Sequence, residues 1–68
     1  MPIISFESAP LSDSVRAQLI ERLTDTAVEI TGIPKQLFFV TIRELPANSI
    51  AVGGKTVEQI KQELAAQS

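Results

Sequence analysis

The sequence begins MPIISFES, and the second residue, Pro2, has the clearest potential for chemistry. If Met1 is removed, Pro2 carries a secondary amine at the start of an apolar strand. An α-amino group has a pKa near 7.7–8.0, and an apolar pocket lowers that pKa because burial disfavours the cation. Such an amine can act as a general base near neutral pH. The structural alternative is a proline at the first position of a strand, where it is tolerated. If Met1 is retained, the nitrogen belongs to an amide and cannot act as a base.

Basic side chains that could hold an anionic ligand are few. Arg43 lies near the end of a predicted strand, Lys35 precedes that strand, and Lys55 follows a double glycine. For each of them a solvated charge or an ion pair between subunits is the favoured interpretation over ligand binding. Arg16 and Arg22 fall on the polar side of a predicted helix, and we interpret them as surface charges.

The composition excludes several classes of protein. Eight acidic and six basic residues are scattered along the chain, without the basic face that binds nucleic acid. The sequence has no Cys and no His, so we expect no disulfide, no metal site and no cofactor. No apolar run approaches the roughly 20 residues that span a bilayer. The start lacks the basic and long apolar segments of a signal peptide, and we expect a cytoplasmic protein with no membrane partner.

A strand, a long helix and a second strand are predicted in the first two thirds of the chain. Residues 2–7 alternate as in a strand, with Ile4 and Phe6 on one face. A helix should follow Ser12 as N-cap and end near Gly32. Residues 37–44 are apolar on both faces, which is typical of a covered parallel strand. The helix should bury one apolar stripe against these strands: Val15, Leu19, Leu23, Ala27 and Ile30.

The last third of the chain predicts smaller elements. Residues 46–49 form a predicted turn, residues 50–52 a short extended piece, and Gly53-Gly54 a sharp bend. Residues 56–59 have a capping-box pattern that should open a second, shorter helix. Its apolar stripe would consist of Val57, Ile60 and Leu64. The fold class is therefore α/β, a β-α-β unit with a short C-terminal hairpin and helix, in a single domain over residues 1–68.

Association with further copies of the chain is the expected source of stability. A chain of about this size buries only about 60% of the surface of its unfolded form, yet 44% of the 68 residues are hydrophobic. Two strands covered by one helix leave the other sheet face bare. We therefore expect a homo-oligomer in which a second subunit covers that face.

The order of these features resembles the small 4-oxalocrotonate tautomerase family over nearly the whole chain. The resemblance lies in Pro2 with its PIIxF strand, in Ser12-Asp13 at the helix start, and in the Gly32-Ile33-Pro34 exit. It continues in Ile42-Arg43-Glu44 at the end of the second strand and in the AVGGK segment, residues 51–55. A helix of the ERLTDTAVEITG kind and a tail of the VGGK kind make the sequence most similar to the DmpI-like members.

The resemblance implies an activity and a set of site residues. Pro2, processed to an N-terminal amine, would move a proton between positions of a small enol or unsaturated keto acid, in an assembly that is commonly a hexamer. Leu11 and Phe39 occupy positions where better-known members have substrate-binding arginines, and Ile50 replaces a pocket aromatic. Arg43 shares a strand face with Phe39 but lies roughly 13 Å away along the chain, so only a subunit contact could bring it to the pocket.

Three functions follow from these observations. The first is a tautomerase in which Pro2 acts as general base and then as acid on a small-molecule substrate. The alternative is a catalytically silent oligomeric module that binds an apolar small molecule or a protein partner through the same pocket. A third, ranked last, adds water to an activated double bond and needs a carboxylate near the amine, whereas Glu7 and Glu44 both lie far along the predicted strands.

Overall fold

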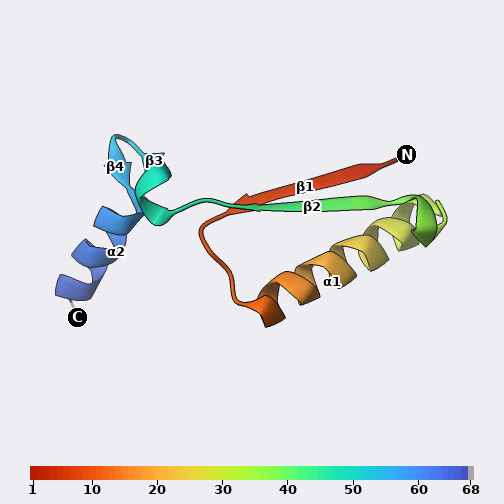
Figure 1. Cartoon of the computed structure of the whole chain (residues 1–68), viewed down its shortest axis with the longest axis horizontal. Helices are drawn as coiled ribbons and strands as arrows, with labels where there is room; N and C mark the ends of the chain where they lie inside the picture. Colours follow the sequence, from red (N-terminus) through yellow and green to blue (C-terminus); the bar gives the residue numbers. More distant parts are fainter. Residues whose placement is uncertain (68) are drawn as a thin grey trace.

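The chain has the α/β order predicted from the sequence. The computed structural model describes residues 1–67, and Figure 1 shows a β-α-β unit followed by a hairpin and a second helix. The strands are β1 (Ile3–Ser8), β2 (Phe39–Glu44), β3 (Ala51–Val52) and β4 (Lys55–Thr56). The helices are α1 (Asp13–Thr31) and α2 (Val57–Ala66), with short 3-10 helices at Lys35–Leu37 and Ala47–Ser49.

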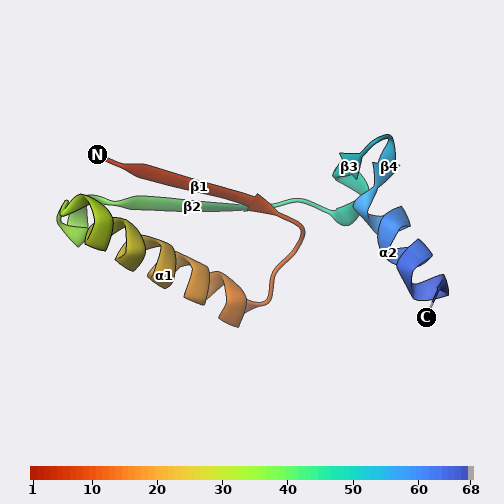
Figure 2. The same cartoon turned by 180° about the vertical axis from the view of Figure 1, so that it is seen from behind.

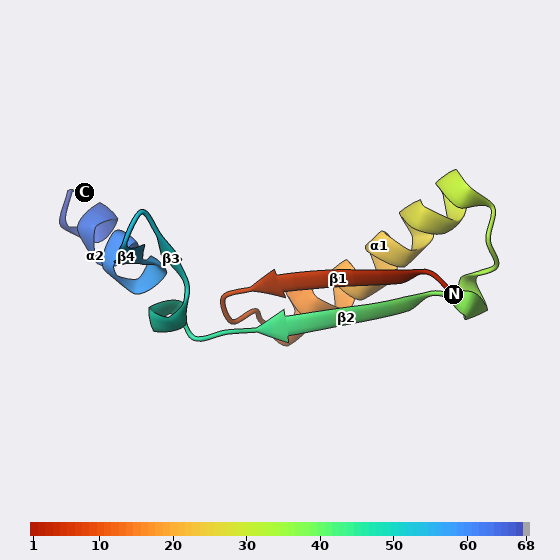
Figure 3. The same cartoon turned by 90° about the horizontal axis from the view of Figure 1, so that it is seen from above.

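β1 and β2 form a two-stranded parallel sheet with an unbroken register. Ile3 pairs with Phe39 at one end and Ser8 with Glu44 at the other. Alternate side chains of both strands are half-buried and exposed. This confirms the alternation predicted for β1, whereas β2, predicted to be covered on both faces, is covered on only one face in the single chain. Figure 3 shows the two strands side by side with α1 behind them, so the helix covers only one face of the sheet. The other face, which we call the outer sheet face, is bare.

The ends of α1 are set by local chemistry, as predicted. The Ser12 hydroxyl accepts a hydrogen bond from the Val15 N–H at 3.2 Å, which satisfies a helix donor that has no partner within the helix. At the other end Gly32 adopts a left-handed φ of 73° and donates its N–H to the Val28 carbonyl at 2.9 Å. A residue with a side chain is strained in that conformation, so glycine ends the helix here.

The predicted apolar stripe of α1 is only partly confirmed. Leu19, Leu23 and Ala27 are half-buried, whereas Val15 remains 43% and Ile30 79% exposed. The only buried residue among residues 1–67 is a polar one, Thr24. Its hydroxyl donates to the Ile20 carbonyl one turn earlier at 2.7 Å. Burial of this side chain therefore leaves no hydroxyl without a partner.

Several boundaries differ from the sequence prediction. β1 begins and ends one residue later than predicted, and β2 begins at Phe39 rather than at residue 37. The cause at β2 is a 3-10 turn after Pro34, whose carbonyl accepts the Leu37 N–H at 3.0 Å. The predicted turn at residues 46–49 is a 3-10 helix closed by the Ser49 N–H and the Pro46 carbonyl, 2.8 Å apart.

Residues 46–67 form a separate unit, which we call the C-terminal arm. The arm holds the β3–β4 hairpin and α2, and the predicted capping box is present: Thr56 and Gln59 exchange hydrogen bonds of 2.8 and 3.1 Å. Figures 1 and 2 show the arm beyond the end of the sheet, away from α1. In the stripe predicted for α2, Val57 and Ile60 are half-buried but Leu64 stays 62% exposed.

The elongated shape leaves the chain without a core of its own. The molecule measures 47 × 22 × 19 Å with a radius of gyration of 15.8 Å, against about 11 Å expected for a compact chain of this length. No hydrophobic side chain in residues 1–67 is fully buried. The accessible surface is 5194 Å², roughly 1000 Å² more than the scaling for folded monomers gives. A single copy is thus an incomplete folding unit.

Candidate functional site

Pro2 lies at the start of β1, beside the first residue of β2. Its carbonyl accepts the Phe39 N–H at 3.0 Å, and Ile3 is the cross-strand partner of Phe39. Pro2 is half-buried, while the preceding Met1 is 82% exposed. Ile3 and Phe39 project from the outer sheet face with 67% and 50% of their surfaces exposed. The residue predicted to act as a base therefore lies next to an apolar patch that a partner could cover.

Leu11 and Ile50 lie at the opposite end of the molecule from Pro2. The six residues of β1 span about 20 Å, and Leu11 follows β1 in the connection to α1. Ile50 belongs to the C-terminal arm, where its carbonyl accepts the Val57 N–H at 2.7 Å. Figure 1 shows the N-terminus and the arm at opposite ends of the sheet. Within one chain, the structure brings Phe39 to Pro2 but neither Leu11 nor Ile50.

Arg43 lies on the outer sheet face with Phe39 but is held by its own cross-strand partner. Its guanidinium is 3.7 Å from the Glu7 carboxylate, and both side chains are well exposed. The polarity of the face changes along the strands, from an apolar pair near Pro2 through a hydroxyl pair to this ion pair. These pairs are Ile3 with Phe39, Ser5 with Thr41, and Glu7 with Arg43.

The two candidate lysines also have partners within the chain. Lys35 lies 3.7 Å from Asp25, and Lys55 lies 2.9 Å from Glu63. More than half of each of these side chains is exposed, and exposed pairs of this kind contribute about 0.2–1 kcal/mol. Neither lysine lies on β1 or β2. The structure thus gives them the surface role that the sequence left open beside ligand binding.

Sequence reasoning missed a polar cluster that joins the start of α1 to the end of β2. Arg16, assigned to a solvated surface, donates from Nε to Glu44 at 2.8 Å and from Nη2 to Glu44 at 3.2 Å. The same Nη2 donates to the Leu11 carbonyl at 3.1 Å, while the Leu11 N–H donates to Glu44 at 2.7 Å. One signal could have found it: Arg16 stands three residues before Leu19 and seven before Leu23, so it shares the row of the predicted apolar stripe.

These contacts shift the ionisation of both charged partners. Hydrogen bonds from the Arg16 guanidinium, and then from the Leu11 N–H, lower the pKa of the Glu44 carboxyl below its ordinary 4.5. The pKa of Arg16 is raised further, chiefly by its hydrogen bond to Glu44 and then by one to Asp13. Both groups are therefore charged at neutral pH. The cluster is an ion pair in which Glu44 also binds the Leu11 N–H and Arg16 also binds the Leu11 carbonyl.

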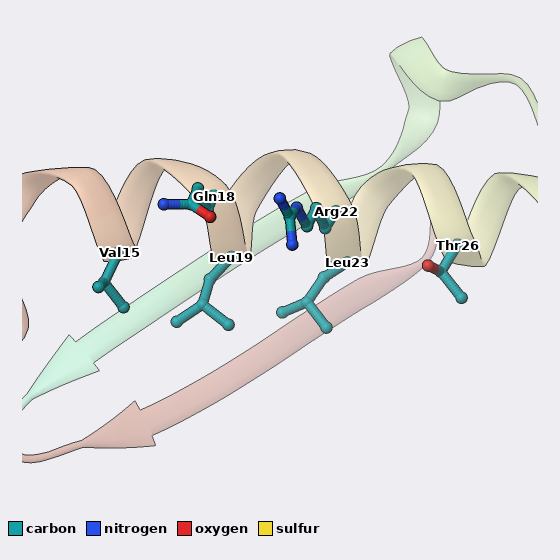
Figure 4. Close-up of a pocket in the computed structure, with 6 residues that line it drawn as sticks. All are labelled: Val15, Gln18, Leu19, Arg22, Leu23 and Thr26. Carbon is teal, nitrogen blue, oxygen red and sulfur yellow. The ribbon is translucent and has the colours of Figure 1, made fainter.

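A shallow depression of about 300 Å³ runs along α1, and neither Arg16, Glu44 nor Leu11 lines it. Figure 4 shows Val15, Leu19 and Leu23 in a row on one side of the helix, with Gln18 and Arg22 on another. None of the site residues predicted from the sequence lines it.

Within residues 1–67 there is also no cluster of three acidic, His or Cys side chains that could hold a metal ion. No helix in this part is long and apolar enough to cross a membrane.

A parallel β-α-β unit followed by a short hairpin and a final helix, with a proline at position 2, matches the tautomerase fold. The family model described as "Tautomerase enzyme" matches residues 2–60. The chain belongs to this family, and its structural relatives place it with the 4-oxalocrotonate tautomerases.

Solved structures show the likeness in detail. DmpI from Helicobacter pylori is 28% identical, with a TM-score of 0.77 over 84% of this chain and 97% of that one. DmpI from Archaeoglobus fulgidus is 32% identical, with a TM-score of 0.78 over 84% and 98%. TomN, a 4-oxalocrotonate tautomerase homologue of a tomaymycin biosynthetic pathway, is 31% identical, with a TM-score of 0.83 over 98% and 100%. A comparison with curated proteins gives no match.

Proposed function

We propose that the protein is an isomerase that interconverts enol and keto forms of a small unsaturated acid, with Pro2 as the catalytic residue after removal of Met1. The observation that carries the proposal is the place of Pro2. It lies at the head of β1, half-buried beside Ile3 and Phe39, in a chain of the tautomerase family. In this setting a secondary amine at position 2 is held by the sheet and meets apolar surface on one side.

The chemistry needs one group that takes up and then returns a proton. The free amine of Pro2 removes the proton from the enol hydroxyl or from the carbon next to the carbonyl. The resulting ammonium then delivers a proton to the other position, so that the double bond moves and nothing else is gained or lost. Covering of the Ile3–Phe39 patch lowers the pKa of the amine below about 7.7–8.0, because the cation loses water. The amine is then largely free at neutral pH.

The proposed pocket requires a second subunit. Pro2 and Phe39 lie at one end of each chain, and Leu11 and Ile50 at the other, about 20 Å away. A homo-oligomer that places the Leu11 and Ile50 end of one subunit against the Pro2 end of another would unite them. We favour a hexamer. The exposed outer sheet face and the roughly 1000 Å² of excess surface support association of this kind.

The proposed lining also restricts the substrate. Leu11, Phe39 and Ile50 contribute aliphatic and aromatic surface but no guanidinium fork, which is the group that suits a carboxylate. We therefore propose a substrate with a single carboxylate and an apolar remainder. Arg43 of a neighbouring subunit would hold the carboxylate, because its exposed contact with Glu7 at 3.7 Å exchanges easily for a ligand.

The test joins the intact mass of the untagged protein to an assay of ketonisation. Phenylenolpyruvate, an apolar monocarboxylate, and 2-hydroxymuconate, a dicarboxylate, are compared for the wild type and Pro2→Ala. We expect a mass without methionine, a loss of about 10²- to 10⁴-fold in kcat for Pro2→Ala, and a preference for phenylenolpyruvate. The pH profile of kcat/KM should rise through a pKa below that of an ordinary α-amino group.

One observation favours a second candidate function. The apolar lining at Leu11, Phe39 and Ile50 also suits a silent module that binds an apolar small molecule or a protein partner. A processed protein that is no faster than Pro2→Ala on either enol would reject the isomerase. Saturable binding of an apolar dye by that same protein, lost on substitution of Phe39, would then support the module.

A further inference from the structure

The cluster of Arg16, Glu44 and Leu11 links three separate segments of the chain at one point. Glu44 is the last residue of β2, Leu11 lies in the connection after β1, and Arg16 belongs to the first turns of α1. The partners are 28 and 33 residues apart in the sequence. The cluster therefore fixes the position of the loop 9–12 relative to both the sheet and the helix.

The Arg16–Glu44 pair is less exposed than the ion pairs of Lys35, Arg43 and Lys55. Arg16 and Glu44 are 33% and 27% exposed, and the guanidinium meets both carboxylate oxygens at 2.8 and 3.2 Å. Paired contacts of this kind hold orientation as well as distance. The pairs of Lys35 with Asp25 and Arg43 with Glu7 are single contacts of 3.7 Å between well-exposed side chains.

The backbone of Leu11 is bound at both of its polar groups. Its N–H donates to Glu44 at 2.7 Å, and its carbonyl accepts from Arg16 at 3.1 Å. Residues in a surface loop are ordinarily free to exchange such contacts with water. Here both peptide groups that flank the Leu11 Cα are held, so the direction of the half-buried Leu11 side chain is fixed.

We propose that Arg16 and Glu44 are positioning residues that hold Leu11 as an apolar wall of the substrate pocket of the neighbouring subunit. This inference rests on the proposed function, in which Leu11 closes a pocket around Pro2 of another chain. The same contacts keep the guanidinium away from the wall, because the Nε and Nη2 atoms of Arg16 donate to Glu44 and Leu11 of their own chain. The pair acts through Leu11 and does not touch the substrate.

The kinetic test uses three variants and a matched control in the untagged, assembled protein. Arg16→Met removes the guanidinium, Glu44→Gln removes the charge that binds it, and Arg16→Lys keeps a charge but not the fork. The control is Asp13→Asn, which removes an exposed partner of Arg16 at 2.9 Å but leaves the contacts with Glu44 and Leu11. If Arg16→Met does not fold, Arg16→Lys and Glu44→Gln carry the test.

The expected result is a change in substrate binding alone. For Arg16→Met and Glu44→Gln with phenylenolpyruvate, KM rises about 5- to 10-fold, as for the loss of one oriented contact. kcat and the pH profile assigned to Pro2 stay within about twofold, since the base is not touched. The KM of Arg16→Lys lies between the KM of these variants and that of the wild type, and the KM of Asp13→Asn equals that of the wild type. Equal KM values in all variants, or a loss confined to kcat, would overturn the inference.

A second readout does not depend on activity. Amide hydrogen exchange by NMR follows the Leu11 N–H, which should be protected in the wild type and in Asp13→Asn. It should exchange at least about tenfold faster in Glu44→Gln, which loses the charged acceptor. Unchanged protection would show that the cluster does not hold the loop, and would overturn the inference even in an active enzyme. A wild type no faster than Pro2→Ala would instead remove the proposed function, whatever the exchange result.

Discussion

Substitution of Ile3 by Thr tests whether the outer sheet face is the surface between subunits. Complete burial of an isoleucine side chain is worth about 1.5–3 kcal/mol, and Ile3 is 67% exposed in the single chain. A subunit that covers the rest should gain about 1–2 kcal/mol from this residue. Threonine keeps the branched shape that suits a strand but replaces apolar surface with a hydroxyl, so most of that gain is lost.

The effect on assembly is larger than the effect on one chain. A two-fold contact contains Ile3 from both subunits, so Ile3→Thr should raise its dissociation constant about 30- to 1000-fold. Sedimentation equilibrium over a dilution series measures this constant. Ile30→Thr is the matched control, because Ile30 is 79% exposed but lies on α1, across the sheet from this face. The reasoning is refuted if both variants shift the constant equally, or if the wild type is monomeric at every concentration.

Three further predictions concern the stability of single elements. Glu44→Gln should flatten the dependence of the unfolding free energy on pH. The lowered pKa of Glu44 stabilises the wild type above about pH 4.5, and this stabilisation is lost as the pH falls through the folded pKa. Urea titrations from pH 7 to pH 2 measure the difference. Gly32→Ala should lower the unfolding free energy by about 1–2 kcal/mol, because φ at this position is 73°, and Gly32→Asn should lower it less in the same titration. Thr56→Ala should weaken α2 by about 1 kcal/mol and speed amide exchange in its first turn, without altering exchange in α1.

Local chemistry explains why the ends of the elements could be predicted from the sequence. Ser12, Gly32 and the Thr56–Gln59 box act within four residues of themselves, so the sequence contains the whole interaction. The alternation of β1 also needs no distant information: it placed Ile4 and Phe6 on one face, and the structure shows that this face is the half-buried one. The order of the predicted strands and helix along the chain then indicated the β-α-β unit.

Features that depend on distant or absent partners could not be predicted in the same way. Thr24 is not part of the predicted apolar stripe, yet it is buried, and its hydroxyl binds its own helix. Arg16 looked like a solvated charge because its partner Glu44 is 28 residues away. Alignment to the family named Leu11 and Ile50 as neighbours of Pro2, and only the structure shows that one chain holds them at opposite ends.

The sheet register also sets an order of events during synthesis. Each paired position of β1 meets its partner 36 residues later, as Ser5 does with Thr41, so β1 leaves the ribosome long before it can pair. At 5–20 residues per second this delay lasts about 2–7 s. During that time the Pro2 carbonyl has no Phe39 N–H to bind, and the bond after Met1 is open to an aminopeptidase. Translation of α1 thus provides an interval before the sheet forms in which Met1 can be removed, as the proposed function requires.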